Sequence, residues 1–167
     1  TGMDAISYQS SSGAMGEYAG LISISNYLSN RDNTVYHKNN PLVCLIPESA
    51  HGTNFASAKL AGYTIEKILT NKNGTISIDN LAIILDKYKG RIGCLMVTYP
   101  STYGFFDDNI LDICDKVHNA GGQVYMDGAN MNAMCGLLRV GDLGADVCHL
   151  NLHKTFCIPH GGGGPGM

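Results

Sequence analysis

The chain has 167 residues, of which 44% are apolar and only 15% charged, so it can bury one sizeable core. Its formal net charge of -3, from 11 Lys and Arg against 14 Asp and Glu, leaves no basic stripe and argues against nucleic-acid binding. No stretch approaches the length of a membrane span, and the N-terminus has no apolar signal core, so we expect no membrane association.

Hydrophobic patterns predict alternating helices and strands along the chain. Helices are expected at residues 13–28, 48–62, 79–89 and 107–120, and strands at 42–46, 63–69, 92–99, 123–127 and 147–151. The first helix follows serines at 10–12, and its predicted inward face comprises Ala14, Tyr18, Leu21, Ile22 and Leu28. Strands that alternate with helices pair in parallel through crossovers. The predicted fold class is therefore α/β: a mostly parallel central sheet with helices on both faces, forming one domain over residues 1–167.

Six cysteines are scattered through the chain without a C-x-x-C pair, and four of them lie inside apolar runs. Cysteines placed in this way behave as small hydrophobic residues. We therefore predict a reducing compartment and no disulfide framework.

Polar segments follow four of the predicted strands, at residues 49–53, 98–102, 127–130 and 151–155. In open parallel sheets ligands bind outside the carboxyl ends of the strands. We therefore expect these loops to converge on one site.

Lys154 is the strongest single candidate for chemistry. It is the only lysine after Lys116, and it lies between the apolar run 145–150 and four glycines at 161–164. A lysine beside strand-like segments and flexible backbone is a candidate amine nucleophile.

Asp127 ends a predicted buried strand and is followed by Gly128 and Ala129, whose small size lets a flat ligand approach the backbone. A buried carboxylate needs a cationic partner, which a protonated ring nitrogen would provide. The alternative interpretation is that Asp127 only caps the following turn.

Two further positions suit a flat, phosphorylated ligand. His51 begins a predicted helix and could stack on an aromatic ring, although a single histidine there is often structural. Ser12, Gly13 and Ala14 open the first helix, where unpaired backbone N–H groups can hold a phosphate. Most serine-rich helix caps bind nothing, so this feature alone is weak.

Together, a lysine amine, an aspartate, a histidine and a helix N-terminus form the set that pyridoxal phosphate requires. Their joint occurrence is more informative than any single member.

Five strings carry a family resemblance: QSSSGAMGEYAGL, ESAHGTNFASAKLAG, MVTYPSTYGFF, YMDGANMNA and HLNLHKTFCIPHGGGGPGM. They resemble the glycine decarboxylase (P protein) family of the glycine cleavage system, which are fold-type I pyridoxal-phosphate enzymes. The resemblance runs along essentially the whole chain. Because the chain also lacks an initiator methionine, we expect it to be an internal fragment, the core of the cofactor-binding large domain.

The resemblance implies roles for residues at matching positions. Lys154 corresponds to the Schiff-base lysine, Asp127 to the partner of the pyridinium and His51 to the ring-stacking residue. Positions at the phosphate-binding helix start and in the pocket lining are matched by Ser12, Gly13, Ala14, Ala129, Thr102 and His153.

The resemblance also implies the reaction. Glycine would be decarboxylated, its aminomethyl group would pass to the lipoyl arm of the carrier (H) protein, and CO2 would leave. The family is an aminomethyl-transferring glycine dehydrogenase, expected as a homodimer or heterotetramer in the mitochondrial matrix of a eukaryote or the cytoplasm of a bacterium. Because the small C-terminal domain is absent, the fragment alone is expected to be inactive.

The sequence departs from the family pattern before and inside the first helix. Ser10 and Ser11 stand where a proline and an asparagine are expected, and Met15 stands where glutamine is more frequent. A polar role for that last side chain is therefore not expected here.

Three alternatives remain open at this stage. The first is a zinc module, since Cys148, His149, His153, Cys157 and His160 lie within thirteen positions, although strand alternation would point Cys148 and His149 to opposite faces. The second is a nucleotide-binding domain that uses the glycines at 161–164 as a phosphate loop. These glycines have neither the G-x-G-x-x-G spacing nor a Gly-Lys-Ser/Thr ending, so a flexible passage beside Lys154 or a close backbone approach at a subunit interface is the better interpretation. The third is another fold-type I decarboxylase or transferase.

Overall fold

The computed structural model describes residues 1–36 and 39–156. Within these residues five strands form one fully parallel sheet in the order β2-β1-β3-β4-β5. The strands are β1 (Val43–Pro47), β2 (Thr64–Ile68), β3 (Ile92–Thr98), β4 (Gln123–Gly128) and β5 (Val147–Leu150). This architecture confirms the predicted α/β class, and each strand lies within one or two residues of its predicted position.

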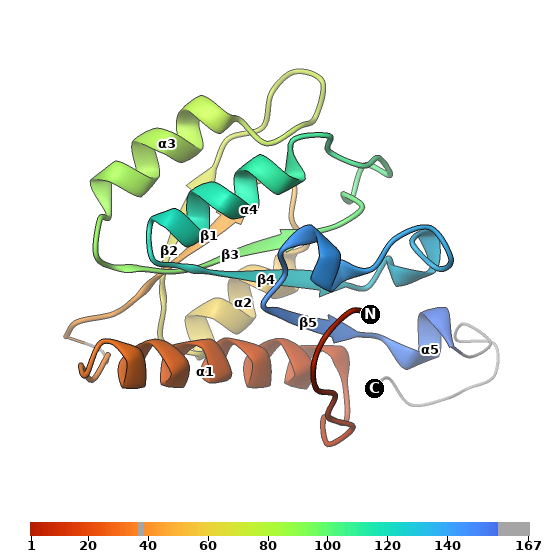
Figure 1. The fold of residues 1–167 in the computed structure, drawn as a ribbon, viewed down its shortest axis with the longest axis horizontal. Coiled ribbons are helices and arrows are strands. Elements are labelled where there is room, and N and C mark those ends of the chain that lie inside the picture. The colour runs from red at the N-terminus through yellow and green to blue at the C-terminus, as the bar shows by residue number, and fades with distance from the viewer. Residues whose placement is uncertain (37–38, 157–167) are drawn as a thin grey trace.

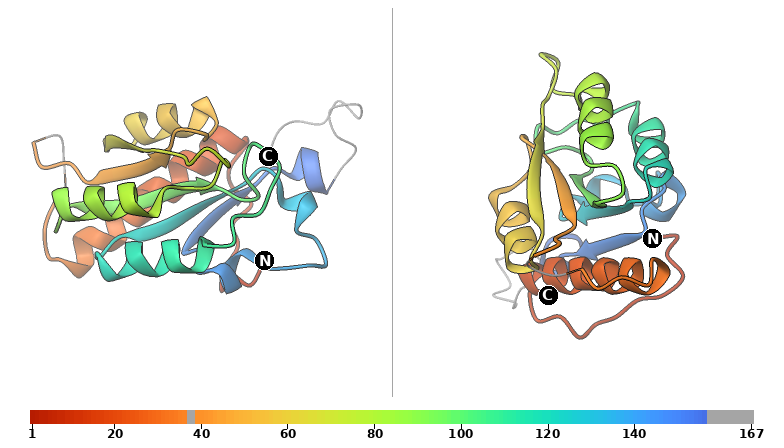
Figure 2. Two further views of the ribbon diagram at one scale, coloured as in Figure 1. Left: turned by 90° about the horizontal axis from the view of Figure 1, so that it is seen from above. Right: turned by 90° about the vertical axis from the view of Figure 1, so that its left-hand side faces the viewer.

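Helices cover both faces of the sheet, as Figure 1 shows: α1 and α2 lie on one side and α3 and α4 on the other. The helices are α1 (Gly13–Arg31), α2 (Gly52–Leu60), α3 (Ile78–Lys87), α4 (Ile110–Asn119) and the short α5 (Leu152–Thr155), with 3-10 turns at Met131–Ala133 and Val140–Leu143. Figure 2 shows the same three layers seen along the sheet. None of the helices in the described part of the chain has the length and hydrophobicity to cross a bilayer.

Two hydrophobic clusters, one on each face of the sheet, form the core. On β3 the side chains alternate between them, because Leu95 joins the cluster under α3 and α4 while Met96 joins the one under α1 and α2. All seven residues of β3 are buried, as expected for a central strand covered on both faces. Each fully buried Leu or Met contributes about 1.5–3 kcal/mol to the hydrophobic stabilisation.

Three glycines let α1 lie close to the sheet. A Cβ at Gly16 would lie 3.1 Å from the Cβ of His149, and one at Gly20 would lie 2.5 Å from a ring carbon of Tyr125. Gly13 approaches Asn151 in the same way. Larger side chains at these positions would hold the helix away from β4 and β5.

This close approach corrects the predicted inward face of α1. Leu21 and Leu28 are buried as expected, but Ala14 is exposed, and Tyr18 and Ile22 are half-buried. The buried positions of the helix are Glu17, Gly20, Leu21, Ile24 and Leu28. The apolar pattern missed this face because glycine and a buried glutamate occupy part of it.

α2 begins four residues later than predicted, because Pro47 to Ala50 form a turn after β1 and His51 caps the helix. The five cysteines in the described part of the chain are free. Cys157 lies outside the described residues.

The strand order shows which edge of the sheet is suited to ligand binding. From β1 the chain pairs with β2 on one side and with β3 on the other, which makes a topological switch point. α1 runs against the strand direction, so its N-terminus lies at the carboxyl edge of the sheet, next to α5 (Figure 1).

Candidate active site

A pocket of about 380 Å³ opens at the carboxyl edge of the sheet, beside the N-terminus of α1. Its wall comes from all four predicted loops, which confirms that they converge. The lining residues are Gly13, Ala14, Glu17, His51, Thr53, Thr98, Thr102, Asp127, Ala129, Asn130, His149, Asn151 and Lys154.

The start of α1 forms one wall. The Ser12 hydroxyl accepts a hydrogen bond from the Met15 N–H at 3.2 Å, so Ser12 is the N-cap. Gly13 and Ala14 line the pocket, whereas Ser12 does not. The first N–H groups of a helix have no partner within it, and the positive end of the helix dipole lies there. This wall can therefore hold an anion.

Asp127 forms the floor of the pocket and is only 3% exposed. Its Oδ1 accepts a hydrogen bond from the Ala129 N–H at 2.9 Å, and its Oδ2 accepts one from the Asn54 side chain at 3.0 Å. His149 Nε2 lies 3.4 Å from Oδ1. The carboxylate is thus held in one orientation, as a group that must bind a ligand atom requires.

His149 and Tyr125 were not predicted as part of this site, beyond the appearance of His149 in the zinc alternative. Tyr125 lies two residues before Asp127 on β4, and its hydroxyl is 2.8 Å from His149 Nδ1. Burial, followed by the Asp127 carboxylate, raises the pKa of Tyr125 well above its ordinary value. The phenol therefore keeps its proton. The register that pairs Asp127 with His149 is the signal that could have found this contact.

His51 caps α2 at the pocket mouth. Its Nδ1 accepts from the Thr53 N–H at 3.2 Å and lies 2.8 Å from the Thr53 hydroxyl. That hydroxyl donates to Glu17 Oε1 at 3.0 Å. Glu17 is 3% exposed, and its other carboxylate oxygen has no hydrogen-bond partner among the described residues. A buried acid in the pocket wall was not anticipated from the sequence.

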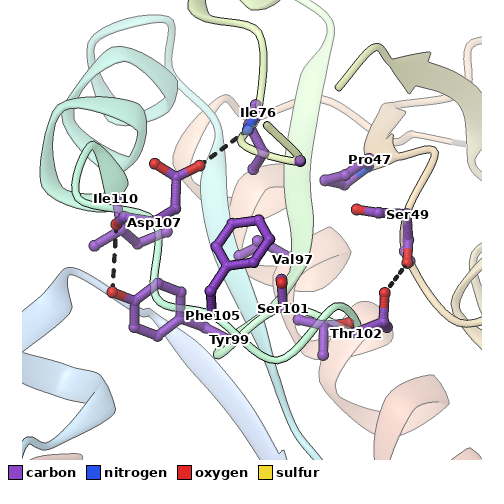
Figure 3. Close-up of a pocket in the computed structure, with 13 residues that line it drawn as sticks. Pro47, Ser49, Ile76, Val97, Tyr99, Ser101, Thr102, Phe105, Asp107 and Ile110 are labelled. Carbon is purple, nitrogen blue, oxygen red and sulfur yellow. Dashed lines mark hydrogen bonds between the residues drawn. The ribbon is translucent and has the colours of Figure 1, made fainter. Parts of the chain in front are cut away.

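Thr102 lies on the loop after β3, and its hydroxyl donates to the Ser49 carbonyl. Figure 3 shows this contact beside a second cavity of about 20 Å³, behind the loop. The loop is fixed from outside by Asp107, whose carboxylate accepts from the Ile76 N–H at 2.9 Å. Thr102 therefore belongs to a rigid part of the pocket rim.

α5 brings Lys154 to the pocket wall. Lys154 is exposed and lines the pocket, while Asn151, which precedes the helix, is buried at 6% exposure. His153 is half-buried and does not contribute to the pocket wall. The pocket thus contains both an accessible amine and an oriented buried carboxylate.

A metal ion could also use part of this wall. Ligand atoms of Glu17, Asp127 and His149 lie within 4.8 Å of one another, and they form the one such group in the described part of the chain. The zinc alternative is not supported there, since Cys148 packs against the α3–α4 cluster while His149 faces Tyr125. Cys157, His160 and the glycines at 161–164 lie outside the described residues.

Comparison with solved structures identifies the class. The rice protein TDC, solved with PLP and tryptamine, matches with a TM-score of 0.67 and 18% identity over 87% of this chain and 33% of its own. A glutamate decarboxylase domain from Vibrio parahaemolyticus matches with a TM-score of 0.67 and 20% identity over 88% of this chain and 35% of its own. The fold is therefore that of the fold-type I pyridoxal-phosphate-dependent enzymes.

Sequence comparison then names particular relatives. The chain is 59% identical to the mitochondrial glycine dehydrogenase (decarboxylating) of Gallus gallus and 55% identical to that of Homo sapiens, each over 100% of this chain and 16% of the relative. The Rhizobium johnstonii enzyme is 56% identical, with 17% of its length covered. No family model matches the chain. Along its whole length the chain is therefore similar to one segment of the glycine dehydrogenases (decarboxylating), as the sequence strings predicted.

Proposed function

We propose that residues 1–167 form the cofactor-binding core of a glycine dehydrogenase (decarboxylating) that uses pyridoxal phosphate. The observation that carries this proposal is that Lys154, Asp127 and His51, which are distant in sequence, line one pocket. The identity of 55–59% with the chicken and human relatives supports glycine as the substrate.

The pocket fits this cofactor on three points. Asp127 is buried and oriented at the floor, where a protonated ring nitrogen would neutralise it. The helix start at Gly13 and Ala14 suits a phosphate. Thr98 Oγ1 is buried without a hydrogen-bond partner in the described residues, as expected for a hydroxyl whose partner is a ligand.

Each wall of the pocket has a role in this proposal. Lys154 would hold the aldehyde carbon of the cofactor and would be displaced by the glycine amine. Asp127 would hold the ring nitrogen, and His51 would lie against the ring. When bound, the cofactor accepts the electron pair that decarboxylation releases. Asn54 and the Ala129 N–H hold Asp127 in position, so its charge stays directed at the ring nitrogen.

The finer parts of the proposal concern the whole enzyme. The aminomethyl group would pass to the lipoyl arm of the H protein, and the intact enzyme would be a homodimer or heterotetramer. We place the enzyme in the mitochondrial matrix if the source is a eukaryote, as for the chicken and human relatives, and in the cytoplasm if it is a bacterium.

The test uses the full-length protein that contains this chain. After addition of pyridoxal phosphate and borohydride reduction, peptide mapping should find the pyridoxyl group on Lys154. Lys154→Ala should remove the label, while Lys116→Ala should retain it, because Lys116 forms a surface ion pair with Asp112 on α4. A label that persists on another lysine in Lys154→Ala would overturn the proposed role.

The substrate is tested separately. Release of CO2 from carboxyl-labelled glycine, dependent on lipoylated H protein, is the expected result. Labelling of Lys154 without any glycine turnover would instead favour another fold-type I decarboxylase or transferase.

A further inference from the structure

A row of buried polar side chains lies behind Asp127: the Tyr125 hydroxyl is hydrogen-bonded to His149, and His149 lies beside the Asp127 carboxylate. The role inferred for these side chains rests on the proposed function of Asp127 and extends it to two residues that do not touch the cofactor. We propose that His149 is a positioning residue, which holds Asp127 through Nε2–H, and that Tyr125 sets the tautomer of His149 through Nδ1. Both residues would thereby strengthen the interaction between Asp127 and the ring nitrogen of the cofactor.

The register of β4 and β5 places the three side chains together. Tyr125 and Asp127 lie two residues apart on β4, so they share a face of the sheet. Asp127 pairs with His149 across the parallel ladder. The Tyr125 hydroxyl lies 2.8 Å from Nδ1, and Nε2 lies 3.4 Å from Asp127 Oδ1. The imidazole thus bridges the phenol and the carboxylate.

The chemistry of the neighbours decides which nitrogen carries the proton. Tyr125 is fully buried and keeps its phenol proton, for which His149 Nδ1 is the nearby acceptor. An Nδ1–H tautomer would leave that proton without this acceptor and would direct the lone pair of Nε2 at the Asp127 carboxylate. The Nε2–H tautomer satisfies both contacts. Asp127 then faces donors from three sides: Ala129, Asn54 and His149.

α1 packs against Tyr125 and His149 and holds both side chains beside Asp127. Gly16 lies against His149, and Gly20 lies against the Tyr125 ring, so the helix backbone covers both rings without side chains between. His149 is 8% exposed, and Tyr125 is fully buried. Rings packed in this way cannot rotate away from Asp127.

A double-mutant cycle on the full-length apoenzyme tests the proposal, with the dissociation constant of pyridoxal phosphate measured from its visible absorbance. Tyr125→Phe should weaken cofactor binding by on the order of tenfold, the factor that one net hydrogen bond represents. Asp127→Asn should weaken binding further. In the Asp127→Asn background, Tyr125→Phe should have no additional effect, because the carboxylate that it supports is gone.

Tyr63→Phe is the matched control. Tyr63 is also buried under α1, and its hydroxyl donates to the Leu21 carbonyl at 2.8 Å, with no part in the pocket. The Tyr63→Phe substitution should lower the thermal midpoint of the apoenzyme without changing its affinity for the cofactor. A second pair separates positioning from packing: His149→Gln can offer an amide N–H to Asp127 and should retain more affinity than His149→Leu.

The outcomes separate the two proposals. Additive effects of Tyr125→Phe and Asp127→Asn, or unchanged affinity in Tyr125→Phe, would overturn the positioning role while Asp127 keeps its own. Unchanged affinity and absorbance in Asp127→Asn would overturn the proposed function of Asp127 itself. Equal losses in His149→Gln and His149→Leu would also refute the hydrogen-bonding role.

Discussion

Thr98 and Asp127 are register partners at the carboxyl ends of β3 and β4, and both side chains line the pocket. The two side chains differ in their hydrogen bonding. Asp127 accepts hydrogen bonds from Asn54 and Ala129, whereas Thr98 Oγ1 is buried with no partner in the described residues. The protein thus provides partners for the carboxylate but not for the hydroxyl beside it.

Thr98→Val tests whether that hydroxyl serves a ligand. Valine has nearly the same shape, and the apoenzyme no longer buries an unpaired hydroxyl, so its free energy of unfolding should stay equal or rise by about 1 kcal/mol. Under the proposed function, the affinity for pyridoxal phosphate should fall, because the ligand would lose a hydrogen bond to Thr98. Urea unfolding and cofactor titration measure the two quantities.

The matched control for this variant is Thr70→Val. The Thr70 hydroxyl donates to Glu48 at 2.7 Å on the exposed surface, outside the pocket. Its loss should leave cofactor affinity unchanged. A Thr98→Val protein with lower apo stability and normal affinity would show that the hydroxyl has a structural role only.

Gly20→Ala should destabilise the protein by about 1–3 kcal/mol, the usual cost of overpacking a core. The added methyl would lie 2.5 Å from the Tyr125 ring and 2.8 Å from Val147, so α1 must move away from the sheet. The shift should also weaken cofactor binding, because the start of α1 forms a pocket wall. Denaturant unfolding of wild-type and variant proteins measures the effect.

Gly52→Ala is the control for a glycine-to-alanine change in a helix. A Cβ there meets no atom within 4 Å, and the residue opens α2. Gly52→Ala should raise the free energy of unfolding by up to about 1 kcal/mol, because alanine reduces the conformational entropy of the unfolded chain. Equal destabilisation by both variants would exclude close packing of Gly20 as the cause.

Much of the fold could be predicted because burial on both faces gives strands a continuous apolar sequence. The seven buried residues of β3 are the clearest case. The face of α1 could not be predicted, since Gly20 and Glu17 are part of it and neither contributes to an apolar pattern. Its orientation depends on glycine contacts with β4 and β5, which are set only by the tertiary structure.

The candidate site was predicted for residues whose positions follow directly from strand ends, namely Asp127 and Lys154. His149 and Tyr125 were missed because their role depends on the register between two strands that lie far apart in the sequence. Glu17 was missed because an acid in the first turns of a helix is usually solvated. The roles in cofactor binding of all the candidate residues remain predictions; of these, Ser12 and His153 do not line the pocket.

Thiol reactivity should follow burial and pKa. Burial, and then the Asp127 carboxylate, raises the pKa of Cys148 to about 12, and burial raises that of Cys114 to about 12. The thiolate is the reactive form, so both should resist iodoacetamide in the native enzyme at neutral pH. Cys135 is exposed and should react before Cys114 and Cys148. Peptide mapping after timed labelling gives the order.

Labelling in denaturant is the control for accessibility, and all three cysteines should then react. Native modification of Cys114 at a rate close to that of Cys135 would contradict the burial that the structure assigns to Cys114.

The buried Tyr63 should lower the stability of the protein at alkaline pH. Burial, followed by the nearby Cys94 and Cys44 thiols, raises the pKa of Tyr63 above its ordinary value of about 10. Below that value Tyr63 is protonated in both the folded and unfolded states, so its contribution to stability is complete. Above it the unfolded state loses the proton while the folded state keeps it, and the free energy of unfolding falls by about 1.4 kcal/mol per pH unit.

Tyr63→Phe removes this titration. At about pH 8 the variant should be less stable by about 1 kcal/mol, because the hydrogen bond to Leu21 is lost. Near pH 11 the difference should shrink or reverse, since only the wild type carries the alkaline penalty. Urea unfolding midpoints of both proteins across this range measure the difference. A gap that is constant with pH would mean that Tyr63 ionises equally easily in the folded and unfolded states, in conflict with its burial between α1 and the sheet.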